Sequence, residues 1–405
     1  MTKKTNTRKF RKLFLLFVVI FITSVVLVVE TYAWFVGITT VNVSSFDVTV
    51  TSAQGLELSL NGKYWASGDT TITLNSANIL STNPTTASHG YNGSGNTWPT
   101  NGLKPLSSSG RLNTSTGRLQ LFEKTSLSAT VGGYRLVAKQ VDNSVTEQDG
   151  YIAFDLFIRN GKEDYYSPDN YSVTGGENIY LTKNSSSTYN GTTNHGVANS
   201  VRVGFFALAG TKTTTATDNT TVSALQGLSC STTTSGNDKR ICPSNFDSKG
   251  LSWHIWEPNH NVHTTASRTY FNNICKQRDE ETGEYLSSTC TGFTSNTSEF
   301  NTYTILNEVS ASQDVDIFDG RNGYSYNIGS TWNNSDALFP TPIYTIPSTY
   351  TSNNQLIKLA GNSITKIRVY IWLEGQDVDN YDVIAGDTVK INFGFTKDRF
   401  EIANT

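Results

Sequence analysis

Hydrophobic and polar residues divide this chain into one apolar run near the N-terminus and a long body of short alternating segments. Residues 13–29 are almost uninterrupted by polar side chains. After residue 33 we find no helical period of useful length, and hydrophobic residues instead alternate with polar ones over short stretches. Such a period of two is typical of β-strands with one buried face. The pattern therefore predicts an all-β body.

Individual strands can be placed by this alternation. Residues 55–67 are predicted to form a hairpin, because Leu56, Leu58 and Leu60 alternate with polar residues and Asn61-Gly62 is a strong turn signal. Long stretches rich in Ser, Thr, Asn and Gly cannot bury enough apolar surface to order themselves and are predicted loops; they cover 81–117, 175–199 and 211–237. The remaining clear alternations predict strands over 38–43, 44–51, 151–159, 201–207, 364–373 and 389–395.

Many short strands joined by long polar connections favour an antiparallel β-sandwich of the Greek-key or jelly-roll type. We expect the first and last strands to pair within one sandwich. The predicted organisation is a leader at 1–33, a first part of the sandwich with long loops at 34–209, a loop-rich, disulfide-bearing insertion at 210–345, and C-terminal strands that complete the sandwich at 346–405.

The N-terminal run has the features of an export signal. Six basic residues lie within the first twelve, the apolar segment follows, and small residues at Thr31 and Ala33 predict cleavage between Ala33 and Trp34. The segment is slightly shorter than the roughly 20 residues of a spanning helix. If the segment is retained as an anchor, the basic residues keep the N-terminus on the inner side of the membrane and place the chain from Trp34 onward outside. Either fate predicts a secreted or cell-surface protein, on the extracellular side of the membrane, whose membrane contact is confined to residues 13–29.

Composition agrees with export and argues against nucleic-acid binding. Charged residues make up 16% of the chain, below the usual quarter for globular proteins. Removal of the leader takes six basic residues and one acidic residue, which changes the net charge from −3 to −8. A mildly acidic surface lacks the basic stripe that binding of nucleic acid requires.

All four cysteines lie within one sixty-residue stretch: Cys230, Cys242, Cys275 and Cys290. Outside the cell an even number predicts disulfides, with three connectivities available. We favour Cys230 with Cys242 and Cys275 with Cys290, because each pair brackets a polar segment of loop character. Short C-x-x-C pairs of the kind that bind zinc are absent.

Residues 31–35, Thr-Tyr-Ala-Trp-Phe, and the Thr-, Val- and Ser-rich strand that follows resemble the export signal and first strand of the camelysin and TasA family. Residues 369–377 and 389–393 near the other end are similar to segments of exported Firmicute surface proteins. The resemblance implies an exported fibre protein of a biofilm matrix. The camelysin branch is regarded as metallopeptidase, but no zinc-binding signature is present here to carry that activity over.

Two kinds of metal-ligating residues are clustered in the sequence. His254, His260 and His263 could bind zinc, although H-E-x-x-H is missing and Pro258 interrupts any helix that would align them. Carboxylates that could surround calcium occur in two runs without EF-hand spacing; they are Asp314, Asp316 and Asp319, and Asp377, Asp379 and Asp382. For both runs we favour ordinary turns, in which Asp bonds to its own backbone. We predict no cofactor and leave a calcium ion open.

We find neither a G-x-S-x-G motif nor a phosphate-binding loop. The leading hypothesis is therefore a non-enzymatic structural protein that associates with copies of itself. A strand directly behind the cleavage site is suited to completing a neighbour's sheet, with anchors at Ile38, Val41, Val43, Phe46, Val48 and Val50. That this strand pairs within its own sheet stays open.

Two other functions are considered. One is a surface adhesin or carbohydrate-binding module that binds a glycan or matrix partner, with Trp98, Trp253 and Trp256 exposed to stack on sugar rings. The other is a metal-dependent hydrolase that uses His254, His260 and His263.

Overall fold

The structure is a computed structural model, and all of the residues that it describes belong to one compact unit within residues 41–405. The predicted leader, the cut between Ala33 and Trp34, the four cysteines and the anchors Ile38, Val41 and Val43 lie outside the described residues. No helix within the described ranges combines the length and apolar character needed to cross a membrane. Those ranges are 45–52, 55–61, 64–66, 71–81, 96–113, 118–130, 133–140, 150–160, 177–191, 193–208, 251–269, 308–310, 316–319, 337–338, 341–343, 355–359, 363–375, 377, 379–380 and 387–397.

The described chain is all-β, as predicted. Its strands form two sheets, and the helical residues in the described ranges are α2 (Ser76–Ser81), the 3-10 turn η1 (Val197–Asn199) and a helical stretch at 265–269. The predicted strands at 44–51, 151–159, 201–207, 364–373 and 389–395 are all present. In the predicted hairpin, Leu58 and Ala66 form an antiparallel bridge. Alternating hydrophobicity was thus sufficient to locate the principal strands.

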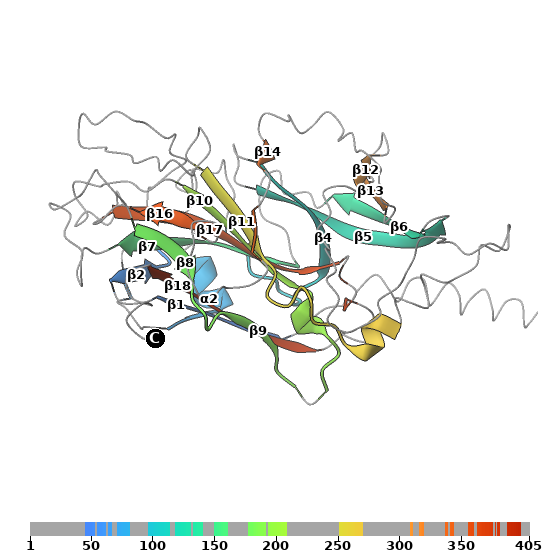
Figure 1. Ribbon diagram of the computed structural model, residues 1–405, viewed down its shortest axis with the longest axis horizontal. Helices are drawn as coiled ribbons and strands as arrows, with labels where there is room; N and C mark the ends of the chain where they lie inside the picture. The colour runs from blue at the N-terminus through green and yellow to red at the C-terminus, as the bar shows by residue number, and fades with distance from the viewer. Residues whose placement is uncertain are drawn as a thin grey trace, which may run out of the picture. The chain divides into compact units, whose positions relative to one another are not determined.

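The smaller sheet joins the two ends of the described chain. β1 (Ser45–Ser52) lies parallel to β18 (Thr388–Lys397), with Val48 opposite Ile391 and Val50 opposite Phe393. The expected pairing of first and last strands is therefore confirmed for the strands described, and Figure 1 shows β1 beside β18. Its other strands are β3 (Ile72–Leu74), which pairs with β1, β8 (Glu177–Leu181) and β9 (Ser186–Tyr189), which pair with β18, and β16 (Ile357–Leu359), which pairs with β8.

The larger sheet is built around β17 (Ser363–Glu374), which lies between β7 (Ile152–Asn160) and β10 (Val201–Leu208) and is antiparallel to both. β11 (Leu251–Trp256) pairs with β10, so this part of the predicted insertion belongs to the larger sheet. The remaining strands are β2 (Leu56–Ser59), β4 (Pro105–Asn113), β5 (Arg118–Thr130), β6 (Gly133–Gln140), β12 (Glu308–Ser310), β13 (Asp316–Asp319), β14 (Ala337–Leu338) and β15 (Thr341–Ile343).

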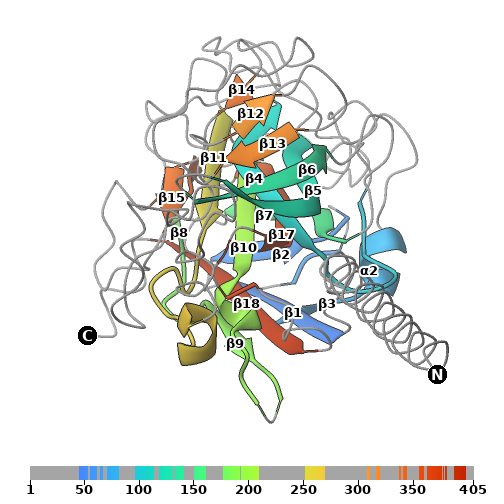
Figure 2. The same cartoon turned by 90° about the vertical axis from the view of Figure 1, so that its right-hand side faces the viewer.

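The central strands are buried on both faces. Odd-numbered residues of β17, such as Ile367 and Val369, belong to a core that also contains Phe393 of the smaller sheet. Even-numbered residues Tyr370 and Trp372 belong to a second core, to which β4 and β5 contribute Leu106, Leu112, Leu119 and Leu121. β4 pairs with β17 over only two residue pairs. Figure 2 shows β4 and β5 in front of the central strands, which agrees with the second core.

Three predictions about the architecture require correction. Residues 175–199 were expected to be mostly loop, but they contain β8, β9 and η1. Residues 81–117 were expected to be a surface loop, but residues 105–113 form β4. Burial of Leu106 and Leu112 and backbone pairing with β5 stabilise this strand despite its polar composition. The sheets were expected to be antiparallel, but β1 with β18, β4 with β17 and β11 with β15 are parallel pairs. Both sheets are therefore mixed.

Candidate functional site

Polar side chains converge at one end of the central strands, and strand direction explains why. β10 is antiparallel to β11 and β17, so the start of β10 lies at the same edge as the ends of its two neighbours. Arg202 is the second residue of β10, Glu257 follows β11, and Glu374 ends β17. The side chains of all three are fully buried. We call these residues, together with His263, Asp377 and Asp379, the polar cluster.

Arg202 is the centre of the polar cluster. Its Nη2 donates to Asp377 Oδ2 at 2.6 Å, its Nε lies 3.1 Å from Glu257 Oε2, and its Nη1 donates to the carbonyl oxygens of Asn199 and Val201 at 2.9 Å each. Burial acts to lower the pKa of this guanidinium, but the surrounding carboxylates outweigh it and the pKa is raised. Arg202 is therefore charged and its charge is matched by acids.

Asp377 and Asp379 form the turn that follows β17. Asp377 Oδ1 accepts a hydrogen bond from the backbone N–H of Asp379 at 2.9 Å, which is the local turn chemistry considered for this run. Burial raises the pKa of Asp377, Arg202 opposes this rise and Asp379 adds to it, and the net shift is upward. The turn prediction was correct for this run, but the burial beside Arg202 was not foreseen.

Asp379 links this turn to two other segments. Its Oδ2 lies 2.7 Å from Nδ1 of His263, and its Oδ1 accepts a hydrogen bond from the backbone N–H of Thr264 at 3.0 Å. Gly196, at φ 105°, lies against the same carboxylate, and a Cβ there would be 2.7 Å from Asp379 Oδ1. Asp379 thus requires a glycine at position 196 and holds three polar segments together.

Glu374 accepts hydrogen bonds from its own strand and from β4. Its carboxylate accepts from the indole Nε1 of Trp372 at 3.1 Å and from the backbone N–H of Ser108 at 3.2 Å. The bond to Ser108 joins the end of β17 to β4. This contact holds together the edge at which the two strands meet.

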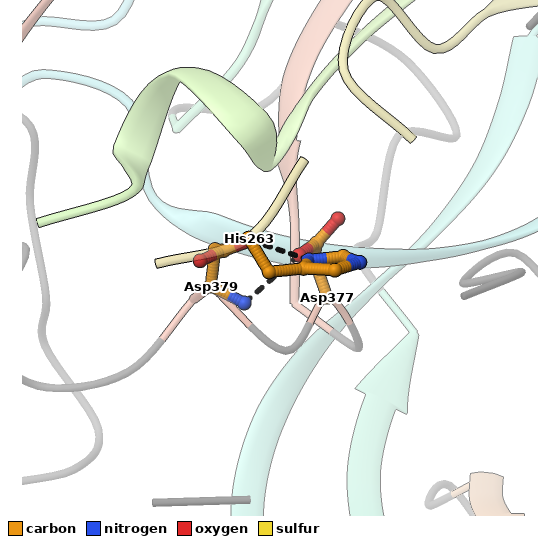
Figure 3. Close-up of side chains that lie close together, drawn as sticks. All are labelled: His263, Asp377 and Asp379. Atoms are coloured by element: carbon orange, nitrogen blue, oxygen red, sulfur yellow. Dashed lines mark hydrogen bonds and ion pairs between the residues drawn. The ribbon is translucent and has the colours of Figure 1, made fainter. Parts of the chain in front are cut away.

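His263, Asp377 and Asp379 are the described residues that could share a metal ion. One ligand atom from each lies within 4.8 Å of the others, and all three side chains are buried. Figure 3 shows the three side chains converging from two segments of the chain. However, each carboxylate oxygen of Asp377 and Asp379 already accepts a hydrogen bond or ion pair from the protein, and Arg202 places a positive charge where a cation would bind. The geometry favours a closed hydrogen-bonded network.

The other metal candidates are not brought together. His254 is half-buried on β11 and His260 is buried, and neither joins His263 in a ligand group within the described ranges. Asp316 and Asp319 lie on strand β13 instead of in a turn, because that segment pairs with β6 and β12. Asp314 and Asp382 lie outside the described residues. The sequence named His263 and Asp377 with Asp379 as separate candidates, and only the fold joins them.

The expected sugar-binding tryptophans are not exposed. Trp253 and Trp256 are 2% and 1% exposed, since both faces of β11 are covered, and Trp253 Nε1 donates to the carbonyl of Gly110 at 2.7 Å. Trp98 is half-buried against Phe46, with ring centroids 4.9 Å apart. The expectation of an exposed aromatic platform at these residues is wrong.

The assembly anchors that the structure describes are part of the chain's own sheet. Val48 and Val50 are fully buried between β18 and β3, and Phe46 is half-buried. Their expected role as a donated strand is therefore incorrect, and the alternative of pairing within its own sheet is confirmed for β1. Anchors before residue 45 lie outside the described residues.

Searches against known proteins identified no relative. No protein-family model matches this chain. Neither the curated proteins nor the solved structures contain a significant match.

Proposed function

We propose that this chain is an exported structural protein of the cell surface or matrix that associates with copies of itself, and that its two sheets form a β-sandwich. The sandwich is supported by the core that the sheets share, in which the rings of Phe205 and Phe393 meet edge to face with centroids 5.5 Å apart. Export is supported by the leader-like pattern of residues 1–33. A structural role is consistent with the resemblance to the camelysin and TasA family.

The observation that carries the proposal is the place at which β1 begins. Ser45 starts a strand that is held on both sides, by β18 and by β3. Residues 34–44 therefore lie between the proposed cleavage site and the folded sheet. If this segment is extended in the assembly, Val41 and Val43 would share one face, a pattern suited to addition onto a neighbour's strand.

A candidate acceptor is the edge of the smaller sheet. Among the described strands, β3 pairs with β1 on one side and with no strand on the other. An incoming strand would form main-chain hydrogen bonds there, and side-chain pockets would set its register. The donor is thus residues 34–44 of one copy, and the acceptor is the β3 edge of the next.

A same-length replacement of residues 34–44 by Gly and Ser, with the leader retained, tests this function. We expect the replaced protein to be exported and folded, with an unchanged thermal midpoint, but to stay monomeric in sedimentation and to form no fibres in negative-stain microscopy. Polymers like those of the unaltered protein would refute strand donation.

A matched pair of charge variants makes the test specific to one face. Val41→Asp with Val43→Asp places two carboxylates on the proposed anchor face, whereas Thr40→Asp with Asn42→Asp places the same charge on the opposite face. Only the first pair should abolish association. Equal effects would show that added charge alone, and not an anchored strand, prevents association.

N-terminal sequencing of protein recovered from the cell surface tests export separately. The expected first residue is Trp34. An intact leader together with surface location would support an anchored form, and recovery from the cytosol would contradict the proposal.

A further inference from the structure

A lysine and an aspartate on neighbouring central strands are buried together. Lys366 Nζ on β17 lies 3.8 Å from Asp155 Oδ2 on β7, and each side chain is 1% exposed. In the register of the two strands Lys366 is opposite Phe157, and Asp155 is opposite Arg368. Lys366 therefore reaches Asp155 diagonally, over a face that it shares with Tyr370 and Trp372.

Burial makes the charged form of this pair costly. Removing an ammonium and a carboxylate from water costs several kcal/mol each, and a contact of 3.8 Å is longer than the roughly 2.8 Å of a charge-assisted hydrogen bond. Desolvation, with a smaller contribution from Arg368, lowers the pKa of Lys366 well below its ordinary value. An unprotonated amine is a nucleophile, whereas an ammonium is not.

Asp155 is held by other residues in an orientation that leaves one oxygen toward the lysine. Arg368 Nη1 lies 3.3 Å from Asp155 Oδ1 and also donates to Asn96 Oδ1 at 3.2 Å, and the same Asn96 oxygen accepts from the backbone N–H of Asp155 at 3.2 Å. The guanidinium of Arg368, which donates to Oδ1, is placed to stabilise negative charge that develops there during attack on Cγ. Oδ2, which faces Lys366, is the oxygen that would leave.

We propose that Lys366 and Asp155 condense after folding into an intramolecular isopeptide bond that joins β17 to β7. The ammonium and carboxylate, or the amine and carboxylic acid after one proton moves between them, contain every atom required. A bond forms between Nζ and Cγ, the bond between Cγ and Oδ2 breaks, and Oδ2 departs as water with two protons from the nitrogen. No oxidant or cofactor is needed, and two buried charges are replaced by one neutral amide. The proposal does not depend on self-association.

The chain contains a matched control. Lys397 is also buried, at 1% exposed, and its Nζ lies 3.0 Å from Glu177 Oε2, but Glu177 is 27% exposed. Water that reaches Glu177 stabilises its charged form and opposes condensation. Lys397 and Glu177 should therefore stay an ordinary ion pair.

Mass spectrometry of the full-length folded and then denatured protein tests the proposal directly. After leader removal and reduction of any disulfides, the expected mass is lower than that of the sequence by one water molecule. Trypsin should fail to cleave after Lys366, and the peptides 140–159 and 359–368 should be recovered as one branched species whose fragmentation places the bond at Asp155 and Lys366. A full sequence mass and separate peptides would overturn the proposal.

Variants check the assignment of the two residues. Lys366→Met should restore the full sequence mass, and Lys397→Met should retain the loss of one water. If Lys366→Met does not fold, the branched peptide of the wild-type protein still decides the question. A loss of one ammonia, with the branch at Asn96, would overturn the assignment to Asp155.

Discussion

Charged side chains inside the larger sheet are the most informative individual residues of this protein. Arg202, Arg368, Lys366 and Asp155 are each 1% exposed or less. Such charges are tolerated only when opposite charges and hydrogen bonds match them. The sequence contained a signal of this at Arg202, because the other residues of its strand are hydrophobic or Gly on both faces.

The raised pKa of Asp377 predicts a pH-dependent contribution to stability. A carboxyl whose pKa is higher when folded binds protons more tightly in the native state, so it stabilises the fold at low pH. That contribution is lost as pH rises from the unfolded value of about 3.9 through the raised folded value. Urea unfolding at several pH values should show the wild type losing stability relative to Asp377→Asn over this window. Parallel pH profiles would contradict the raised pKa.

The polar cluster is expected to act without a metal ion. His263→Ala leaves the buried Asp379 carboxylate without its imidazole partner and should lower the free energy of unfolding by about 1–3 kcal/mol. Val262→Ala, at the exposed neighbouring position, should stay within about 0.5 kcal/mol. Calorimetry of the wild type with and without EDTA should give the same thermal midpoint. A midpoint that rises when zinc or calcium is added would instead establish an ion-binding site.

At the scale of elements, β1 shows how an N-terminal strand is committed to its own sheet. It lies parallel to β18 and antiparallel to β3, and Thr49 Oγ1 donates to Asn392 Oδ1 at 3.0 Å. Parallel neighbours need a crossover connection, and here almost the whole described chain separates the two strands. Their pairing therefore closes the fold, and any donated strand must come from before residue 45.

A pair of substitutions in β1 tests this commitment. Val50→Asp places an uncompensated charge in the core and should destabilise the monomer by more than about 3 kcal/mol. Thr49→Asp, on the half-buried face of the same strand, should cost clearly less. Denaturant unfolding should show the same difference at every protein concentration, because the contacts are intramolecular. A difference that appears only at high concentration would show that β1 contacts another copy.

At the scale of the whole molecule, the central strands connect two hydrophobic cores. β17 contributes Ile371 and Leu373 to the core shared with the smaller sheet, and Tyr370 and Trp372 to the core shared with β4 and β5. Neither core can be exposed without loss of packing on the other face of the same strands. The described body is therefore expected to unfold as one cooperative unit.

Large-to-small substitutions in the two cores test this cooperativity. Phe393→Ala affects the first core and Leu121→Ala the second, and each should cost about 2–5 kcal/mol. Differential scanning calorimetry should show a single transition that both variants shift to lower temperature. Two transitions, of which each variant moves only one, would show that the cores unfold separately.

Much of the strand content could be predicted because alternation of side chains is a local property. Residues 151–159, 201–207, 364–373 and 389–395 alternate clearly, and each is a strand. The predictions failed at residues whose burial depends on elements that are distant in the sequence. Trp253, Trp256 and Lys366 occupy faces that a single strand would leave to solvent, yet all three are buried. The polar cluster was missed as a unit for the same reason, since its members come from the ends of three strands.

The sequence by itself determined that this is an all-β chain, and it predicts an export-type leader, because hydrophobic periodicity and the order of charged and apolar residues follow from the local chain alone. Only the tertiary structure decided which strands pair, which strands are covered on both faces, and which charged side chains contact each other. Those outcomes depend on contacts between residues far apart in the chain, such as Arg202 with Asp377 and Lys366 with Asp155. No local pattern records such contacts, because their energy exists only once the strands have assembled.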